Sequence, residues 1–169
     1  MRKEIDDMST FTKYIIVFFI SMVPIVELRG ALPVAIGWGL NPLASYIICI
    51  IGNMLPVPLI FFFARRVLEW GAKSNVKIIN KFFSFCLRKG HSAGEKLKSK
   101  AGGGLFLALL LFVGIPLPGT GAWTGTLAAS ILDMDFKKSS IAVMLGVLLA
   151  GILIGLLSFF VKGGISYII

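Results

Sequence analysis

Two charged residues interrupt the first apolar part of the sequence. Glu27 and Arg29 follow the apolar run 14–26, and a stretch of 35 positions without a formal charge begins at Gly30. A carboxylate here can bind and release a proton, and a guanidinium beside it can hold an anion through two parallel hydrogen bonds. We interpret this segment, with Gly30 and Pro33, as a substrate site in which Glu27 exchanges protons. The simpler interpretation, two charges at a headgroup boundary or paired with each other, stays open.

A second candidate site lies in residues 114–121, where proline and glycine cluster without any charge. The helix that follows would present unpaired N–H groups and the positive end of its dipole, which suit an anion even without a basic side chain. Asn53, inside another apolar run, could hydrogen-bond to an interrupted segment and is included in the candidate substrate site, although simple packing between helices is the alternative. The candidate binding residues of the second cluster are Pro116, Pro118, Gly119, Thr120, Gly121 and Trp123.

The composition places these residues in a membrane protein. Of 169 residues, 57% are hydrophobic and only 15% are charged, and the mean hydropathy is +0.91. Soluble domains carry about 25% charged residues. Soluble enzymes, disordered chains and secreted disulfide-bonded domains are therefore excluded, and we expect a single all-α membrane domain over residues 1–169.

The lengths of the apolar runs separate complete crossings from partial ones. About 20 helical residues cross a hydrocarbon core of about 30 Å. Two runs are long enough, with 22 and 23 residues: Leu43–Ala64 and Ser139–Val161. The other two runs are broken by charge, glycine or proline into pieces that are too short: 14–26 with 31–40, and 105–113 with 122–132. Backbone groups freed at such breaks are tolerated only inside protein or beside water, so we expect each broken run to form a re-entrant hairpin.

The order of broken run and full helix occurs twice, in residues 14–64 and 105–162. If each hairpin enters and leaves on one face, the second half is inserted upside down relative to the first. We therefore expect an inverted repeat of two units, each a re-entrant broken-helix hairpin followed by a transmembrane helix. Both termini and the turns at 41–42 and 133–136 are expected on the face opposite the linker. Four complete spans are the alternative.

The linker 65–104 carries most of the positive charge. It holds ten basic residues and two acidic ones, whereas six basic residues are assigned to the opposite face. The positive-inside rule then puts the linker in the cytoplasm, where membrane lipids are its expected partners. Within residues 76–89, helical spacing predicts a basic amphipathic helix in the membrane surface, with an apolar side formed by Ile79, Phe82, Phe83 and Cys86.

Other functional chemistry is not apparent in the sequence. His91 is the single histidine, and Cys49 and Cys86 lack ligand spacing, so we expect no metal site and no cofactor. No nucleophile–base pair or phosphate loop indicates a catalytic site, and no module indicates nucleic-acid binding. We therefore expect that the protein is not an enzyme. Asp133 and Asp135 flank a turn and are interpreted as a solvated helix cap.

The two candidate segments resemble a known family. Residues 27–42, ELRGALPVAIGWGLNP, and 114–125, GIPLPGTGAWTG, are similar to the hallmark segments of the putative small multidrug export protein family. The similarity covers about residues 20–160. That family resembles the DedA (VTT-domain) superfamily, which implies two re-entrant hairpins in inverted halves, proton-linked physiology and translocation of lipid phosphates such as undecaprenyl phosphate. DedA proteins typically carry an arginine in the second hairpin as well, and residues 114–129 have none.

The function expected from these observations is transport. We expect a small transporter or lipid flippase in a prokaryotic cytoplasmic (inner) membrane, moving an anionic or amphipathic substrate with proton coupling through Glu27. A lipid phosphate is one candidate substrate, and a homodimer is expected. The alternatives are a small-molecule or drug exporter, a non-transporting scaffold or insertion factor, and an enzyme that acts on a lipid headgroup.

Overall fold

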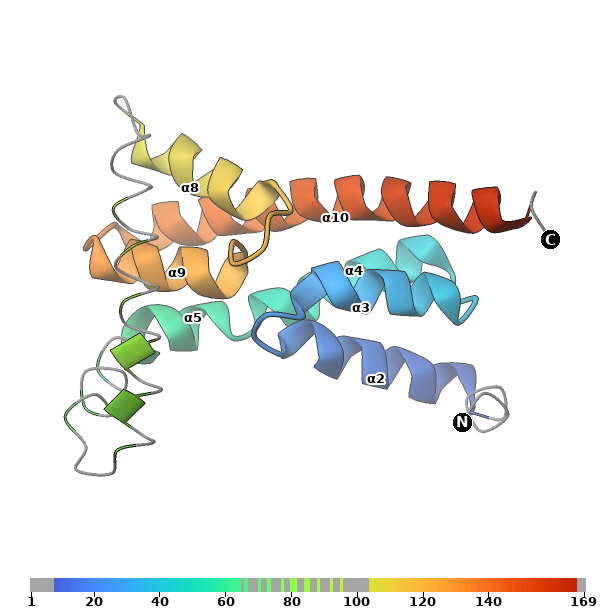
Figure 1. Ribbon diagram of the computed structural model, residues 1–169, viewed down its shortest axis with the longest axis horizontal. Coiled ribbons are helices and arrows are strands. Elements are labelled where there is room, and N and C mark those ends of the chain that lie inside the picture. The colour runs from blue at the N-terminus through green and yellow to red at the C-terminus, as the bar shows by residue number, and fades with distance from the viewer. Residues whose placement is uncertain are drawn as a thin grey trace. The chain divides into compact units, whose positions relative to one another are not determined.

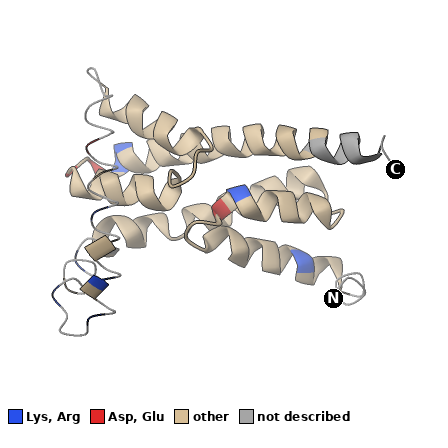
Figure 2. Cartoon of the chain, in the orientation of Figure 1, with Lys and Arg blue, Asp and Glu red and all other residues tan. Residues whose placement is uncertain are grey.

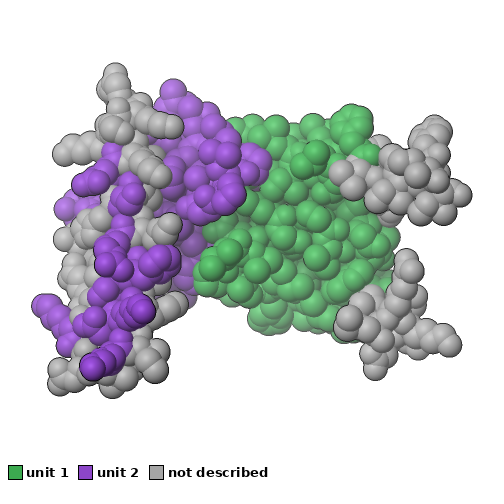
Figure 3. Space-filling model, in the orientation of Figure 1, with its two compact units in different colours: residues 1–55, 148–169 green, residues 56–147 purple. Residues whose placement is uncertain are grey.

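The computed structural model describes residues 8–64 and 104–166, together with single positions between 66 and 95 (Figure 1). The described residues form helices and no β-strand, which confirms the expected all-helical class. They fall into two compact units (Figure 3). Unit 1 consists of Met1–Leu55 and Leu148–Ile169, and unit 2 consists of Pro56–Val147.

A hairpin of two short helices forms the first part of unit 1. Helix α2 (Thr10–Met22) begins after Ser9, whose hydroxyl accepts a hydrogen bond of 3.2 Å from the Thr12 N–H. Helix α3 (Glu27–Gly37) follows four residues later, and both helices pack against α4 (Pro42–Met54). The expected break at Glu27–Gly30 was wrong in position. The chain turns earlier, at Pro24, whose fixed φ and missing N–H suit a turn, so the charged residues form the first turn of α3.

The first long apolar run is helical but irregular. It contains α4, the short helix α5 (Val57–Leu59) and the π-helix η1 (Ile60–Ala64). Pro56 and Pro58 lack the N–H that a regular helix needs, which explains the interruption after α4 and the change of hydrogen-bond pattern beyond it. Pro42–Phe63 as a whole is long and apolar enough to cross a membrane.

The second hairpin lies in unit 2. Its helices α8 (Leu105–Gly114) and α9 (Ala122–Ile131) match the expected half-helices to within one residue. They approach closely at Gly125, where an added Cβ would be 2.5 Å from the Val113 side chain. Helix α9 also packs against η1. In the same unit, the rings of Phe61 and Phe136 meet edge to face with centroids 5.2 Å apart.

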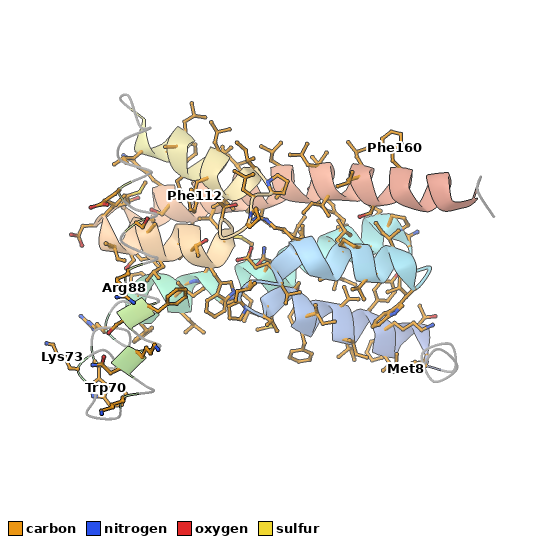
Figure 4. The ribbon with its side chains drawn as sticks, viewed as in Figure 1. Met8, Trp70, Lys73, Arg88, Phe112 and Phe160 are labelled. Carbon is orange, nitrogen blue, oxygen red and sulfur yellow. The ribbon has the colours of Figure 1, made fainter. Side chains whose placement is uncertain are left out.

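The last helix, α10 (Phe136–Ser166), contains the second candidate membrane span, Phe136–Ser158. Gly151 packs against the ring of Tyr46, and the phenol of Tyr46 donates a hydrogen bond of 2.8 Å to the Leu148 carbonyl oxygen. Gly151 and Gly155, which have GxxxG spacing, thus serve helix packing within unit 1. Helices α4, α8 and α9 carry no charged residue (Figure 2). Large apolar side chains lie exposed, as Phe160 does at 72% (Figure 4), which suits contact with lipid.

The same turn ends the second helix of each hairpin. After α3, the N–H groups of Gly39 and Leu40 donate to carbonyl oxygens in the last turn, each at 3.1 Å. After α9, Asp133 and Met134 donate in the same way, at 3.3 and 3.0 Å. This pair of bonds is a Schellman motif, in which one residue takes the left-handed conformation. That residue is Gly39 (φ 74°) in the first turn and Asp133 (φ 50°) in the second.

The next helix is capped in the same way after both turns. Two residues beyond Gly39, the Asn41 Oδ1 accepts hydrogen bonds of 3.0 and 3.1 Å from the first turn of α4. Two residues beyond Asp133, the Asp135 Oδ1 accepts one of 2.9 Å from the Lys138 N–H in α10. The cap expected from Asp133 and Asp135 is thus provided by Asp135, and Asp133 forms the turn.

The turn at 133–136 does not lie opposite the linker, as predicted from the sequence. Ser130, Asp133 and Met134 line one cavity with Phe62 and Arg66, so the turn lies beside the start of the linker. The expected position on the opposite face was wrong because a hairpin returns the chain to the end at which it began. Of the expected amphipathic helix, the apolar positions lie outside the described residues, whereas the described basic ones are exposed: Lys77, Lys81 and Arg88.

Candidate functional site

The carboxylate of Glu27 is buried at the start of α3, with only 4% of the residue exposed. Its φ is 51°, and Ile25 just before it has a φ of 78°. The left-handed conformation costs an ordinary L-residue roughly 1–2 kcal/mol, and for a β-branched side chain it is an outlier. Surrounding structure therefore holds Glu27 in a conformation that a free chain avoids, which is frequent at functional sites.

Backbone hydrogen bonds close the tip between α2 and α3. At the end of α2, the N–H of Val23 donates to the Ile20 carbonyl oxygen at 3.1 Å. The N–H of Glu27 then donates to the Val23 carbonyl oxygen at 3.0 Å, and the N–H of Gly30 donates to the Val26 carbonyl oxygen at 2.9 Å. Ile25 is 96% exposed, so its side chain does not hold it in place. An added Cβ at Gly30 would be 2.5 Å from the Val26 side chain. Glycine therefore allows α3 to begin directly behind the tip.

Arg29 lies two residues beyond Glu27 and is half-buried. The two opposite charges interact electrostatically. Pro33, four residues further along α3, has no N–H and so interrupts the regular hydrogen-bond pattern of the helix.

Asn53 lies near the end of α4 and is only 2% exposed. Within the described part of the chain, its Oδ1 has no hydrogen-bond partner. Next to it, an added Cβ at Gly52 would be 2.6 Å from the Phe18 carbonyl oxygen, so α4 touches the last turns of α2 here. Because α4 runs back along α3 (Figure 1), Asn53 lies at the end of the hairpin where α3 begins with Glu27.

Ser21, in the last turn of α2, was not among the predicted site residues. Ser21 is fully buried against Gly52, and its hydroxyl donates a hydrogen bond of 2.6 Å to the Phe18 carbonyl oxygen. A serine one turn from a Gly/Pro break, facing a glycine in the next apolar run, is a signal for a close helix crossing. That signal was available in the sequence.

The second tip is organised by Thr120. Its hydroxyl lies 3.0 Å from the Ile115 carbonyl oxygen and 2.8 Å from that of Leu117, and it donates within the loop. Gly119 and Gly121 take φ values of 80° and 145°, which glycine adopts without strain. No side chain caps the beginning of α9. Pro116, Pro118 and Gly119 are exposed, Trp123 is half-buried, and Gly121 is buried.

The predicted binding residues thus fall into two groups. Unit 1 holds Glu27, Arg29, Gly30 and Pro33 on α3 with Asn53 on α4, and unit 2 holds the residues of the second tip. Among the described residues, no three His, Cys, Asp or Glu side chains are placed to hold a metal ion. Cys49 is free and buried in α4. His91 and Cys86 lie outside the described residues.

Two apolar helices long enough to cross a membrane, with the shorter apolar helices Thr10–Met22 and Leu105–Gly114, indicate an integral membrane protein. The chain belongs to the family described as Putative small multi-drug export protein, whose sequence profile matches residues 27–153. The match begins at Glu27 and includes both groups of candidate residues. No curated protein and no solved structure gives a significant match. The family resemblance is thereby confirmed, its name indicates an export role, and the relation to DedA stays a prediction.

Proposed function

We propose that this protein is a small membrane transporter in which Glu27 couples proton movement to the movement of an amphipathic substrate with an anionic group. The observation that carries the proposal is the burial of the Glu27 carboxylate beside Arg29 inside an apolar hairpin. A charge within a membrane costs roughly 2.5–3.5 kcal/mol on insertion scales, so such residues usually have a function. The family's name supports a role in transport and does not specify the coupling.

The proposed coupling depends on competition for Arg29. While Glu27 is ionised, its carboxylate interacts with the guanidinium. When Glu27 takes up a proton, that attraction is lost, and Arg29 can hold the anionic group of the substrate. Proton and substrate therefore bind together and leave together, and their gradients set the direction of net movement. The buried Oδ1 of Asn53 would accept a hydrogen bond from the substrate.

We further propose that the two hairpins are re-entrant and belong to an inverted repeat. The thirteen residues of α2 span about 20 Å and the ten of α8 about 15 Å, both short of a hydrocarbon core of about 30 Å. The matching turns support the repeat, because the same interval separates Gly39 from Asp133 and Asn41 from Asp135. Short helices that meet near the midplane of an inverted repeat are typical of transporter binding sites.

The linker is proposed to be cytoplasmic. Lys137 and Lys138 follow the turn that lies beside Arg66, so they join the ten basic residues of the linker at one end of the membrane region. Apart from Arg29 in the first hairpin, four basic residues are left for the other end: Arg2, Lys3, Lys13 and Lys162. By the positive-inside rule, the linker end faces the cytoplasm.

Transport of dyes by the purified full-length protein in liposomes tests the proposal. A sulfonated fluorescent dye should move with protons, and ethidium, a cation, should not. Glu27→Gln and Arg29→Ala should each lower the flux at least tenfold while thermal unfolding in detergent stays cooperative. Glu95→Gln changes an exposed glutamate in the same way and should leave the flux unchanged. Unaltered flux in both site variants would refute the assignment.

A lipid-phosphate flippase is the second candidate, and Arg29 favours it because a guanidinium binds phosphate through two hydrogen bonds. The exposed apolar tip at Ile25 would suit a lipid chain. A fluorescent prenyl phosphate in the same liposomes distinguishes this function by its faster exchange between leaflets. A scaffold or insertion factor predicts no movement of either probe, and the expected homodimer is tested by native mass spectrometry.

A further inference from the structure

Three polar side chains lie in a row on the buried side of α4. Ser45, Cys49 and Asn53 are four residues apart, so they share one side of the helix. Ser45 and Cys49 are fully buried, and only 2% of Asn53 is exposed. Helices α2 and α3 pack against α4. Because α4 runs back along α3, the row ends near the start of α3, where Glu27 lies (Figure 1).

Two atoms of this row have no hydrogen-bond partner among the described residues. They are the Ser45 hydroxyl oxygen and the Asn53 Oδ1. A buried polar group without a partner costs about 1–3 kcal/mol, and the interior of a membrane supplies no bulk water to replace the partner. Most buried polar groups in proteins have a partner, and where no protein atom serves, an ordered water often does. The row therefore indicates bound water.

The second half of the chain provides a comparison for this row. The interval that relates Asn41 to Asp135 also relates Ser45 to Ser139. In both halves the serine N–H donates to the carbonyl oxygen of the cap residue at 2.9 Å. The Ser139 hydroxyl is also buried and has no partner within the described part of the chain. Helices α4 and α10 therefore begin alike.

The correspondence continues as far as the close helix crossings. At Gly52 an added Cβ would be 2.6 Å from the Phe18 carbonyl oxygen. At Gly146, which the same interval relates to Gly52, an added Cβ would be 2.8 Å from the Leu110 carbonyl oxygen. Each glycine thus approaches the first helix of its own hairpin. The buried positions of the two helices can therefore be compared one by one.

Beyond the serine, the two halves differ. Cys49 corresponds to Val143, and both residues are fully buried. Asn53 corresponds to Val147, and each of these residues is 2% exposed. Valine therefore serves for packing at both positions in the second half. Because the fold does not require a thiol or an amide there, the polar row of unit 1 indicates a function at Glu27, to which the row leads.

We infer that Ser45, Cys49 and Asn53 bind a row of water molecules through which protons reach Glu27 from the Asn41 end of α4. Four helical residues rise about 6 Å, about twice the length of one hydrogen bond, so one water between neighbouring side chains completes the row. Each water accepts a proton from one neighbour and passes another proton on, so the side chains are unchanged after the transfer. Before the substrate binds, the last water donates to the Asn53 Oδ1.

The direction of proton entry follows from the position of the row. The candidate span Pro42–Phe63 separates the Asn41 end of α4 from the linker, so protons enter at the membrane face opposite the linker. The delivery of protons to Glu27 rests on the proposed function, whereas the presence of water along the row does not. The two statements therefore need separate experiments.

Exchange of the Cys49 thiol proton for deuterium tests for water without any transport. In the full-length Cys86→Ala protein Cys49 is the single thiol, and infrared spectroscopy follows its S–H band after transfer to deuterium oxide. The matched control carries Cys49→Val, Cys86→Ala and Val143→Cys, which places the single thiol at the corresponding position of α10. The Cys49 band should decay at least tenfold faster than the band of this control. Equal decay of the two bands would overturn the inference.

The serines provide a second comparison in the same measurement. Ser45→Ala removes the first hydroxyl of the row and should slow the decay of the Cys49 band at least threefold. Ser139→Ala removes the corresponding hydroxyl in the second half and should leave that decay unchanged. Equal effects of the two substitutions would contradict entry of water at Ser45.

Proton delivery is tested with the full-length protein in liposomes that contain an internal pH-sensitive dye. Cys49→Val should slow the acidification driven by an aromatic sulfonate gradient at least fivefold, and Cys49→Ser, which keeps a polar group, should retain most of the rate. Cooperative thermal unfolding of both variants separates this effect from misfolding. Acidification that requires Glu27 but is equally fast in Cys49→Val would overturn the path and leave the proposed function standing. Acidification that survives Glu27→Gln would instead refute the proposed function.

Discussion

The hydroxyl of Ser130 on α9 donates a hydrogen bond of 2.6 Å to the carbonyl oxygen of Phe61 in the π-helix η1. The two residues are 69 positions apart, so this bond joins the second hairpin to the end of the first long apolar run within unit 2. A π-helix departs from the regular hydrogen-bond pattern, and a side chain from a neighbouring helix here supplies a donor to one of its carbonyl groups.

Replacement of Ser130 should measure how much this hydrogen bond contributes to the free energy of unfolding. Ser130→Ala leaves a partly buried carbonyl without that donor and should lower the free energy of unfolding by about 1 kcal/mol. Ser45 on α4 is also fully buried, but its hydroxyl has no partner among the described residues. Ser45→Ala should therefore be neutral or stabilising. Chemical unfolding of the detergent-solubilised protein checks both variants, and equal losses would contradict the account.

Glycines at helix crossings should differ in their tolerance of alanine. At Gly52 an added Cβ would be 2.6 Å from the Phe18 backbone oxygen, which cannot move without shifting α2. Gly52→Ala should therefore lower the free energy of unfolding by about 1–3 kcal/mol, the usual cost of overpacking. At Gly155 the nearest atom, on Leu32, is 3.6 Å away, so Gly155→Ala should be tolerated. Comparable melting temperatures for the two variants would be evidence against this crossing.

The left-handed conformation of Ile25 predicts an unusual response to glycine. Ile25→Gly relieves the steric cost, so the free energy of unfolding should stay constant or rise by up to about 1 kcal/mol. Ile47 is also exposed but lies inside the regular helix α4, where glycine should cost about 1 kcal/mol or more. The comparison needs unfolding curves of the two variants and of the unchanged protein. A loss at Ile25 as large as that at Ile47 would show that the tip is not strained.

Labelling of single cysteines from each side of the membrane distinguishes re-entrant hairpins from complete spans. The background carries Cys49→Ala and Cys86→Ala, and cysteines replace the exposed residues Pro42 and Lys137. Re-entrant hairpins should place these two labels on opposite faces, with Lys137→Cys on the face of a linker label at Glu95→Cys. Four complete spans would put Pro42→Cys and Lys137→Cys on the same face, away from the linker.

The sequence predicted the elements of the fold better than their connections. Helices α8 and α9 were placed to within one residue because the residues that bound them also bound the apolar runs: Gly104, the glycine and proline cluster 114–121, and Asp133. The first break was misplaced because Glu27 and Arg29 are conspicuous by charge, whereas the backbone turns at Pro24 and Ile25. A left-handed isoleucine follows from no rule of composition or spacing, so only the structure identifies it.

The structure describes the surroundings of the predicted site residues, and their binding roles stay predictions. Burial of Glu27 and Asn53 agrees with the importance given to them, although binding by either stays a prediction. Thr120 was selected as a ligand, and its hydroxyl donates within its own loop. Asp133 and Asp135 are identical in type and two residues apart, so spacing alone could not separate the turn residue from the cap. Comparison with the first half separates the two roles, because Gly39 occupies the position of Asp133 and Asn41 that of Asp135.

Proton movement that accompanies substrate movement tests the central claim most directly. Liposomes that contain the purified protein and an internal pH-sensitive dye are exposed to an outside gradient of a non-fluorescent aromatic sulfonate. The account predicts that the sulfonate enters with protons and acidifies the interior, that Glu27→Gln abolishes the acidification, and that Glu95→Gln preserves it. Acidification of equal size in the Glu27→Gln variant, or sulfonate entry without any change of internal pH in the unchanged protein, would contradict the account.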